Sequence, residues 1–166
     1  AARNRPVPVP VALVGAVPAS AVRLWAILKL AAANGERPTQ ADLAARCGIG
    51  VRQLRNLIRD LEAVGALVTQ QAGDGRPLEY DLHDLPGSRV TVDAQRLAGC
   101  SAAALVHWIA ITAATRRHGP TVYQAAIGDL CGTTAWTVGR HVADLEARGW
   151  LTVRSNGPMR PRAYYL

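Results

Sequence analysis

An internal repeat constrains the fold of this chain more than any other feature of its 166 residues. Residues 39–82 align without a gap with residues 123–166, and both copies contain a Cys-Gly pair, the run Asp-Leu-Glu-Ala and a Tyr near the end. Upstream, Trp25 aligns with Trp108 once one extra residue is allowed in the second copy. A match of this length predicts that one structural unit is present twice.

The repeat also determines the domain boundaries that we expect. The first domain covers 9–82 and the second covers 92–166. Residues 83–91 contain a Pro-Gly pair and are predicted to be the linker, and residues 1–8 are predicted to form a Pro-rich N-terminal arm. Apolar residues make up 49% of the chain and charged residues 19%, which is enough apolar material to build folded cores.

Each copy begins with two predicted helices. Residues 20–32 and 101–114 place apolar side chains at helical spacing. In both copies, a Thr followed three residues later by an acidic or amide residue indicates where the second, shorter helix starts. These pairs are Thr39 with Asp42, and Thr121 with Gln124, the second of which is a Thr-x-x-Gln capping box. We expect Gly48 and Gly132 to end these helices, because glycine readily adopts the left-handed conformation.

A third helix and a hairpin complete each copy. The third helix is predicted at 51–64 and 135–148, each time with a buried apolar stripe. The stripe residues are Leu54, Ile58 and Leu61 in the first copy and Val138, Val142 and Leu145 in the second. Two short apolar runs around a Gly-rich turn then predict a β-hairpin. The expected fold class is mainly α with small β-hairpins.

This order of elements resembles the winged helix-turn-helix family of DNA-binding domains. The family has a small residue within helix two, a Gly at the turn, an aliphatic residue before helix three and a Leu-Glu-x-x-Gly-aliphatic run into the wing. The matching residues are Ala44, Gly48, Ile49, Leu61, Glu62, Gly65 and Leu67. In the second copy Gly128 replaces Ala44 and Thr133 replaces Ile49, which predicts a looser turn there. The resemblance implies two tandem winged helix-turn-helix domains, each a three-helix core plus a wing.

The resemblance also implies that helix three enters the major groove of DNA and that the wing contacts the backbone or the minor groove. The outward face of the first helix three has the side chains for this role, because Arg can pair with guanine and Gln or Asn with adenine. These residues are Arg52, Gln53, Arg55, Asn56 and Arg59. No acidic residue lies between Val51 and Arg59, which favours DNA contact over an ordinary solvated face.

The second helix three offers fewer base-reading side chains. Its outer face carries Trp136, Thr137 and Arg140. Trp136 has two interpretations: it packs on sugar or a thymine methyl, or it contacts another protein chain. The sequence therefore leaves open whether this helix reads bases or supports self-association.

Arginines near the two predicted wings are further candidates for DNA contact. Arg76 lies at the tip of the first wing, and the second wing has three arginines on its strands and turn. These three are Arg154, Arg160 and Arg162. A narrow minor groove concentrates negative potential and attracts arginine, although solvated arginines are also common at turns.

The charge balance is compatible with a polyanionic partner. The net charge is +7, and both halves are basic: residues 1–83 carry ten basic and seven acidic groups, and residues 84–166 carry nine and five. All but one of the basic residues are Arg, whose guanidinium group suits phosphate. A GC-rich genome would produce the same Arg bias without selection for binding.

The sequence indicates no enzyme. The four histidines and three cysteines lack metal-ligand spacing, no phosphate-binding Gly loop is present, and we expect no cofactor, no metal and no small-molecule effector. The cysteines, odd in number, are predicted to be small buried hydrophobes. Without an apolar run long enough for a bilayer or a secretory signal, we expect a cytoplasmic, nucleoid-associated protein of a bacterial cell or of its plasmid or phage.

Three functions compete at this level. The favoured one is a sequence-specific binder of double-stranded DNA that regulates transcription. The first alternative is an origin-binding replication initiator of a plasmid or phage, since residues 9–28 look like the winged-helix domains of such initiators, with a helicase as partner protein. The second is a tandem winged-helix scaffold for protein interaction, against which the basic charge counts. A homodimer is left open.

Overall fold

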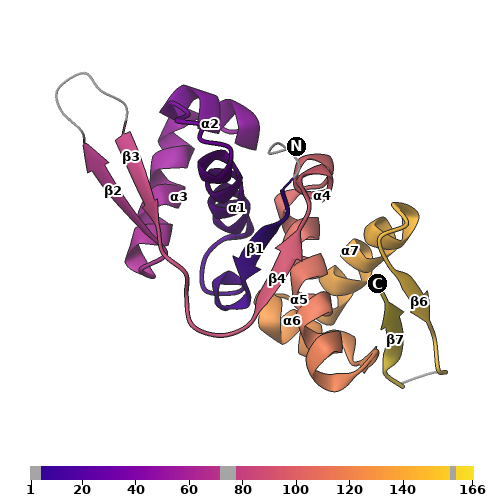
Figure 1. Cartoon of the computed structure of the whole chain (residues 1–166). Coiled ribbons are helices and arrows are strands. Elements are labelled where there is room, and N and C mark those ends of the chain that lie inside the picture. Colours follow the sequence, from indigo (N-terminus) through magenta and orange to yellow (C-terminus); the bar gives the residue numbers. More distant parts are fainter. Residues whose placement is uncertain (1–4, 72–77, 158–159) are drawn as a thin grey trace. The chain divides into compact units, whose positions relative to one another are not determined.

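The computed structural model describes residues 5–71, 78–157 and 160–166 (Figure 1). The chain divides into two compact units between Cys100 and Ser101. This boundary differs from the predicted linker at 83–91, because the end of that segment belongs to a strand of the first unit. The described residues combine helices with small antiparallel sheets, which confirms the expected fold class of a mainly α protein with β-hairpins.

Unit 1 contains the first repeat copy and the beginning of the second. Its helices and strands, in chain order, are β1 (Val7–Pro10), η2 (Val11–Leu13), α1 (Ala19–Ala33), α2 (Gln40–Cys47), α3 (Val51–Ala63), β2 (Leu67–Gln71), β3 (Leu78–Leu82), β4 (Arg89–Val92) and α4 (Ala94–Gly99). The three predicted helices and the hairpin β2–β3 are present within one or two residues of their expected bounds.

Strand β4 explains why the unit boundary lies after residue 92. It pairs antiparallel with β1, with Val7 opposite Val92 and Val9 opposite Val90 (Figure 1). All four valines are at most 2% exposed. Alternating valines on both strands bury one face of the pair, and this apolar surface holds the start of the second repeat copy in unit 1.

The core of unit 1 forms where α1, α2 and α3 pack together. The predicted stripe of α3 is buried, and Trp25 of α1 is fully buried. The Trp25 indole N–H donates to the backbone carbonyl of Ala66 at 3.1 Å, so its polar atom is satisfied inside the core. This bond ties α1 to the residue that precedes β2.

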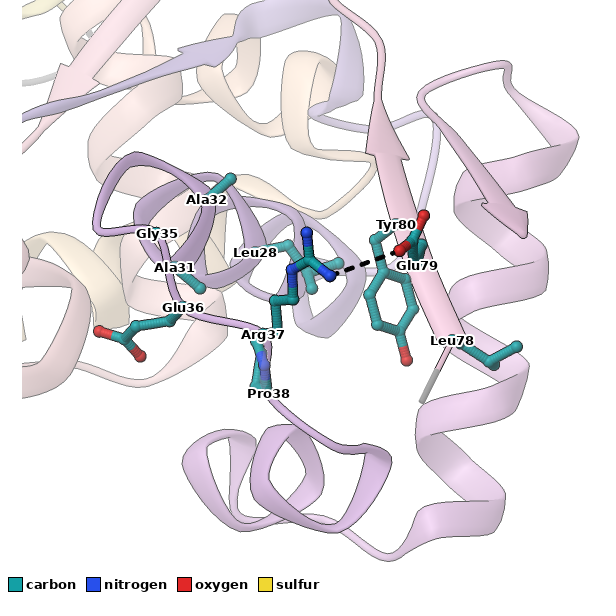
Figure 2. A pocket seen from close by; sticks show the side chains of 10 residues that line it. All are labelled: Leu28, Ala31, Ala32, Gly35, Glu36, Arg37, Pro38, Leu78, Glu79 and Tyr80. Atoms are coloured by element: carbon teal, nitrogen blue, oxygen red, sulfur yellow. Dashed lines mark ion pairs between the residues drawn. The ribbon is translucent and has the colours of Figure 1, made fainter. Parts of the chain in front are cut away.

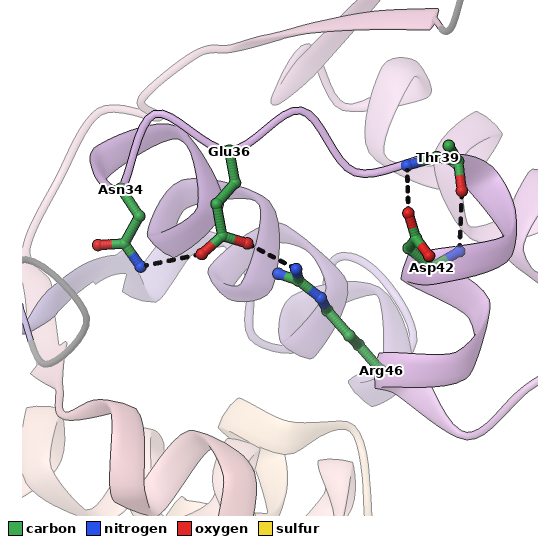
Figure 3. Close-up of polar contacts among 5 residues, drawn as sticks. All are labelled: Asn34, Glu36, Thr39, Asp42 and Arg46. Atoms are coloured by element: carbon green, nitrogen blue, oxygen red, sulfur yellow. Dashed lines mark hydrogen bonds and ion pairs between the residues drawn. The ribbon is translucent and has the colours of Figure 1, made fainter.

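The start of α2 is held by a reciprocal cap (Figure 3). The Thr39 hydroxyl accepts from the backbone N–H of Asp42, and the Asp42 carboxylate accepts from the N–H of Thr39 at 3.1 Å. The bond from the Thr39 backbone N–H to the carboxylate, followed by the interaction of the carboxylate with the Thr39 side chain, holds the pKa of Asp42 below its ordinary value. Gly48 ends the helix with φ +67°, as does Gly132 in unit 2, so both predicted glycine stops are confirmed.

Unit 2 repeats the helix order and adds a third strand. Its elements are α5 (Ala102–His118), β5 (Thr121–Val122), α6 (Gln124–Cys131), α7 (Ala135–Ala147), β6 (Thr152–Arg154) and β7 (Arg162–Tyr165). Strand β7 lies between β5 and β6. The predicted capping box of Thr121 and Gln124 is wrong: Thr121 belongs to β5, and the residue before α6 is Tyr123, which makes no side-chain cap.

The turn before α7 is tighter than expected. A Cβ at Gly128 would lie 2.7 Å from the backbone oxygen of Thr133, so the chain at this point approaches too closely for any side chain. The expectation of a looser turn is therefore wrong, because Gly128 permits a closer approach of the backbone rather than a slacker one. The bond from the N–H of Thr133 to the Gly128 carbonyl, 2.8 Å long, has its counterpart in unit 1 between Ile49 and Ala44, at 3.0 Å.

The structure also tests the prediction that the cysteines are buried and the search for a membrane span. All three cysteines are free; Cys100 is buried, whereas Cys47 and Cys131 are only partly buried. The prediction of buried cysteines therefore holds fully for Cys100 alone. No helix in the described part of the chain has both the length and the apolar character needed to cross a bilayer.

Candidate nucleic-acid interface

Helix α3 presents a polar face opposite its buried stripe. The stripe consists of Leu54, Leu57, Ile58 and Leu61, each at most 6% exposed. The five predicted base-reading residues are all exposed, and they are Arg52, Gln53, Arg55, Asn56 and Arg59. The separation follows from the helical period, which turns apolar residues spaced three and four apart to one side. The sequence thus predicted correctly which side chains of α3 face outward.

Most of this face has no partner within the part of the protein that the structure describes. The Arg55 guanidinium donates through Nε to the Gln40 side-chain oxygen at 3.2 Å, which links α3 to the first residue of α2. The other four side chains make no hydrogen bond, ion pair or ring contact with any described residue. Glu62, the acidic residue nearest the end of the helix, accepts a hydrogen bond from the Thr69 hydroxyl at 2.7 Å. Three uncompensated positive side chains, with no acid among them, make a favourable surface for phosphate or base edges.

Helix α7 has the same buried pattern and a different outer face. Trp136 occupies the position of Arg52 and is 72% exposed. The Arg140 guanidinium lies over its indole ring, 5.1 Å from the centroid, which is a cation–π arrangement. Thr137 is partly buried and exchanges hydrogen bonds with Thr134, the residue that caps the helix. Two of the predicted residues of this face, Trp136 and Arg140, therefore contact each other, and Thr137 contacts the helix cap instead.

The position of Arg55 is taken by Gly139 in unit 2. A Cβ at Gly139 would lie 3.4 Å from the amide nitrogen of Gln124, the counterpart of Gln40. The amide nitrogen of Gln124 is buried and has no hydrogen-bond partner among the described residues. The link between the second and third helices that Arg55 makes in unit 1 is thus absent from unit 2.

Two of the predicted wing arginines line a pocket in unit 2. Arg160 and Arg162 border a volume of about 540 Å³ together with the first residues of α6. The other lining residues are Tyr123, Gln124, Ala125, Ser155 and Gly157. The Asn156 side chain donates to the Pro161 carbonyl at 3.1 Å and so ties the two sides of the turn together. The uncapped amides at the start of α6 and two guanidinium groups make this pocket electropositive.

The structure describes one of the two remaining wing arginines, Arg154, and not the other, Arg76. Arg154 lies over the ring of Tyr165, 5.4 Å from its centroid, and is exposed. Arg76 falls within 72–77, outside the described residues. Of the four wing arginines, only Arg160 and Arg162 are brought into one site by the described structure.

Burial shifts the pKa of several titratable groups in unit 2. His107 and His141 have ring centroids 4.3 Å apart, and burial is the first cause that lowers both pKa values from their usual range. Burial also raises the pKa of Cys131 to about 12, which keeps this thiol protonated. Across the described residues, no group of three or more His, Cys, Asp or Glu could hold a metal ion.

Two features of the candidate surface lay beyond the sequence-based predictions. One is the pocket at the start of α6, which requires β5 to pair with β7 and bring the second helix beside the wing. The other is the Arg140–Trp136 stack, for which the four-residue spacing on a helix was an available signal. Compared with known proteins, the chain matches no protein-family model, no curated protein and no solved structure.

Proposed function

We propose that this protein binds double-stranded DNA sequence-specifically through two tandem winged helix-turn-helix domains and regulates transcription. The observation that carries the proposal is the outward face of α3, where Arg52, Asn56 and Arg59 are exposed and have no partner among the described residues. A helix that exposes Arg and Asn, with acids only in its last turn at Asp60 and Glu62, matches the chemistry of base edges in the major groove.

Unit 2 has a different role in this proposal. Its third helix presents Trp136 and Gly139 in place of two arginines, so it offers fewer hydrogen bonds to bases. The pocket lined by Arg160 and Arg162 offers two guanidinium groups and the helix N-terminus to a phosphate of the DNA backbone. We therefore infer that unit 1 supplies sequence discrimination and that unit 2 supplies backbone affinity.

The direct test compares Arg52→Ala with Arg37→Ala on a duplex selected from random sequences. Arg37 is 85% exposed and lies outside α3, so both variants lose one exposed positive charge from unit 1. Arg52→Ala should weaken binding to the selected site by about 1–3 kcal/mol, or about 5- to 150-fold, with a much smaller loss on random duplex. Arg37→Ala should change both affinities little and equally. Equal losses on selected and random DNA for Arg52→Ala would contradict base reading by α3.

The role of unit 2 is tested by the salt dependence of binding. Arg160→Ala should weaken binding to all duplexes alike and reduce the slope of log affinity against log salt by about one. The wild-type chain should lose affinity steeply with salt, whereas a scaffold for protein interaction would show no DNA affinity with such a slope. A footprint with two protected blocks would support DNA contact by both units, and a single block would leave the α7 face for self-association. The position of the site, upstream of a gene or within an origin, separates a regulator from a replication initiator.

A further inference from the structure

Unit 1 contains a groove that the proposed DNA contacts do not use. It lies between the end of α1, residues 35–38 and β3, and has a volume of about 500 Å³ (Figure 2). Leu28 and Ala31 form an apolar floor and are at most 3% exposed. Arg37 and Glu79 face each other across the groove at 3.6 Å. The volume is within the usual range for ligand sites in proteins.

One wall of the groove is an unpaired strand edge. Ala66 and His83 lie opposite each other, one residue beyond the paired strands β2 and β3. The N–H of His83 donates to the carbonyl of Ala66 at 3.0 Å, so this is a hydrogen-bonded pair. Because hydrogen-bonded and non-hydrogen-bonded pairs alternate in an antiparallel ladder, the backbone groups of Leu78 and Tyr80 point away from β2. They make no hydrogen bond with a backbone group of any other described element. The outer edge of β3 is therefore available for a further strand.

Unit 2 shows what covers the equivalent edge. There β5 pairs with β7, with Thr121 opposite Ala163 and Val122 opposite Arg162. The N–H of Tyr164, the counterpart of Tyr80, donates to the Pro120 carbonyl at 2.8 Å. An extended segment of three residues thus fills, in one copy of the repeat, the place that is a groove in the other.

The sequence of unit 1 explains why its own segment does not pair. Pro38 occupies the position of Val122 and has no N–H to donate to β3. Two residues before Pro38, the Glu36 carboxylate contacts the Asn34 amide at the end of α1 and the Arg46 guanidinium on α2 (Figure 3). The ion pair with Arg46 thus holds Glu36 toward α2. Among the described residues, one ion pair links this segment to β3, between the side chains of Arg37 and Glu79, which are 85% and 53% exposed. Such an exposed pair is weak and opens readily.

We propose that this groove binds an extended, uncharged peptide segment of a partner protein, which adds to β3 as a third strand. The free backbone groups of Leu78 and Tyr80 would pair with the peptide backbone, and a small apolar side chain would rest on Leu28 and Ala31. Opposite charges at the mouth favour neither an anion nor a cation. The inference does not depend on DNA binding.

The test uses the complete chain and an acetylated, amidated peptide with the sequence of residues 119–123, Gly-Pro-Thr-Val-Tyr. Binding is followed by the backbone amide signals in two-dimensional NMR. We expect saturable shifts centred on Leu78 and Tyr80 below about 1 mM peptide. The same peptide with N-methylated Val keeps its side chains but loses the N–H that would donate to the Leu78 carbonyl, and it should bind at least about tenfold more weakly.

A matched pair of variants locates the site. Ala32 lines the groove, whereas the next residue, Ala33, is also exposed and does not. Ala32→Leu should reduce peptide affinity about tenfold by occupying space in the groove, and Ala33→Leu should leave it unchanged. The proposal is overturned if the peptide causes no shifts at Leu78 and Tyr80, or if both variants bind it alike. It is also overturned if N-acetylvaline amide binds as tightly as the peptide, because the groove would then be a small-molecule site.

Discussion

Helices α3 and α7 hold equivalent positions in the two repeat copies, and they differ almost entirely on one side. Three of the four buried residues of α3 have an apolar counterpart: Leu54 with Val138, Ile58 with Val142, and Leu61 with Leu145, all at most 6% exposed. The fourth, Leu57, corresponds to His141. On the outer side, the arginine at 52 is replaced by an exposed tryptophan at 136, and Arg55 is replaced by a glycine. The apolar side is thus largely shared by the two helices, while the exposed side differs.

The comparison of α3 with α7 shows that the two copies share a structural framework but differ in their exposed surfaces. The framework consists of the apolar stripe, the positive-φ glycine before the third helix and the hairpin. The surface of unit 1 is suited to hydrogen-bonded contacts, and that of unit 2 combines a cation–π stack with an electropositive pocket. We therefore expect a substitution in the framework to lower the stability of the unit that carries it, in either unit. A substitution on an outer face should leave stability unchanged.

The largest effect is expected from the shared stripe. Leu54→Ala removes a fully buried side chain and should lower the free energy of unfolding of unit 1 by about 2–5 kcal/mol. Val138→Ala, its counterpart, removes fewer atoms and should cost less. Asn56→Ala, on the exposed face of the same helix, should stay within about 0.5 kcal/mol of wild type. Denaturant titration measured by circular dichroism checks all three, and a loss of more than about 1 kcal/mol for Asn56→Ala would break the distinction between framework and surface.

The next effect concerns the turn at which the two frameworks differ. Gly128→Ala introduces a Cβ that would meet the Thr133 carbonyl oxygen at 2.7 Å, so the turn must shift. We expect a loss of about 1–3 kcal/mol in the stability of unit 2. The reciprocal change, Ala44→Gly, should cost about 1 kcal/mol in unit 1 through the flexibility of glycine in a helix. Finding Gly128→Ala more stable than wild type by thermal unfolding would show that this turn relaxes without cost.

A smaller effect separates the two starts of the second helix. Thr39→Ala removes the hydroxyl that caps α2 and should destabilise unit 1 by about 0.5–2 kcal/mol. Thr121→Ala should change the stability of unit 2 by no more than about 0.5 kcal/mol, because Thr121 is an exposed residue of β5 and caps nothing. Thermal unfolding of both variants measures the difference. Equal losses would mean that Thr121 supports α6 in a way that its position in β5 does not indicate.

The repeat and the local patterns predicted most of the framework. The spacing of Leu54, Ile58 and Leu61 was sufficient for α3 and its outward face, because helical periodicity is a local property. The capping prediction succeeded at Thr39 and failed at Thr121 for the same sequence signal. Pairing with β7 draws Thr121 into a strand, and such a contact between residues more than forty positions apart leaves no mark on the local pattern. The β1–β4 pair was missed for the same reason, although the matching valines of the two copies were visible.

Surfaces and pockets were less predictable than helices. Residue types indicated which arginines face outward, but not that Arg55 would be engaged by Gln40 while its counterpart is a glycine. The groove of unit 1 depends on the absence of a strand, for which Pro38 was the only local signal. A pattern of residue types therefore predicts an element better than it predicts what remains open between elements.

The last comparison concerns a buried position with different chemistry in the two units. His107 and His141 lie in contact in unit 2, and their counterparts in unit 1 are Leu24 and Leu57, both buried. The Nδ1–H of His107 donates to the Ala103 carbonyl at 2.7 Å, and its Nε2 is buried without a partner among the described residues. Burial is the main cause of the lowered pKa of both imidazoles, and each has a positively charged or titratable neighbour that lowers it further.

Both histidine pKa values are lowered in the folded state, whereas in the unfolded chain they have the ordinary histidine value of about 6.5. As the pH falls below about 6.5, the unfolded chain therefore binds protons before the folded chain does. The stabilising contribution of the uncharged histidine pair to unit 2 is therefore fully present above about pH 6.5 and is lost as the pH falls through the folded pKa values. The corresponding leucines in unit 1 do not titrate and make no pH-dependent contribution. The double variant His107→Leu, His141→Leu should reduce this acid sensitivity, and His118→Leu, at an exposed position, should not. Tryptophan fluorescence reports mainly on unit 2, which holds three of the four tryptophans. Both imidazoles are uncharged at neutral pH, so the difference between the double variant and wild type should appear only on acidification. An unchanged acid transition in the double variant would assign the pH dependence to other groups.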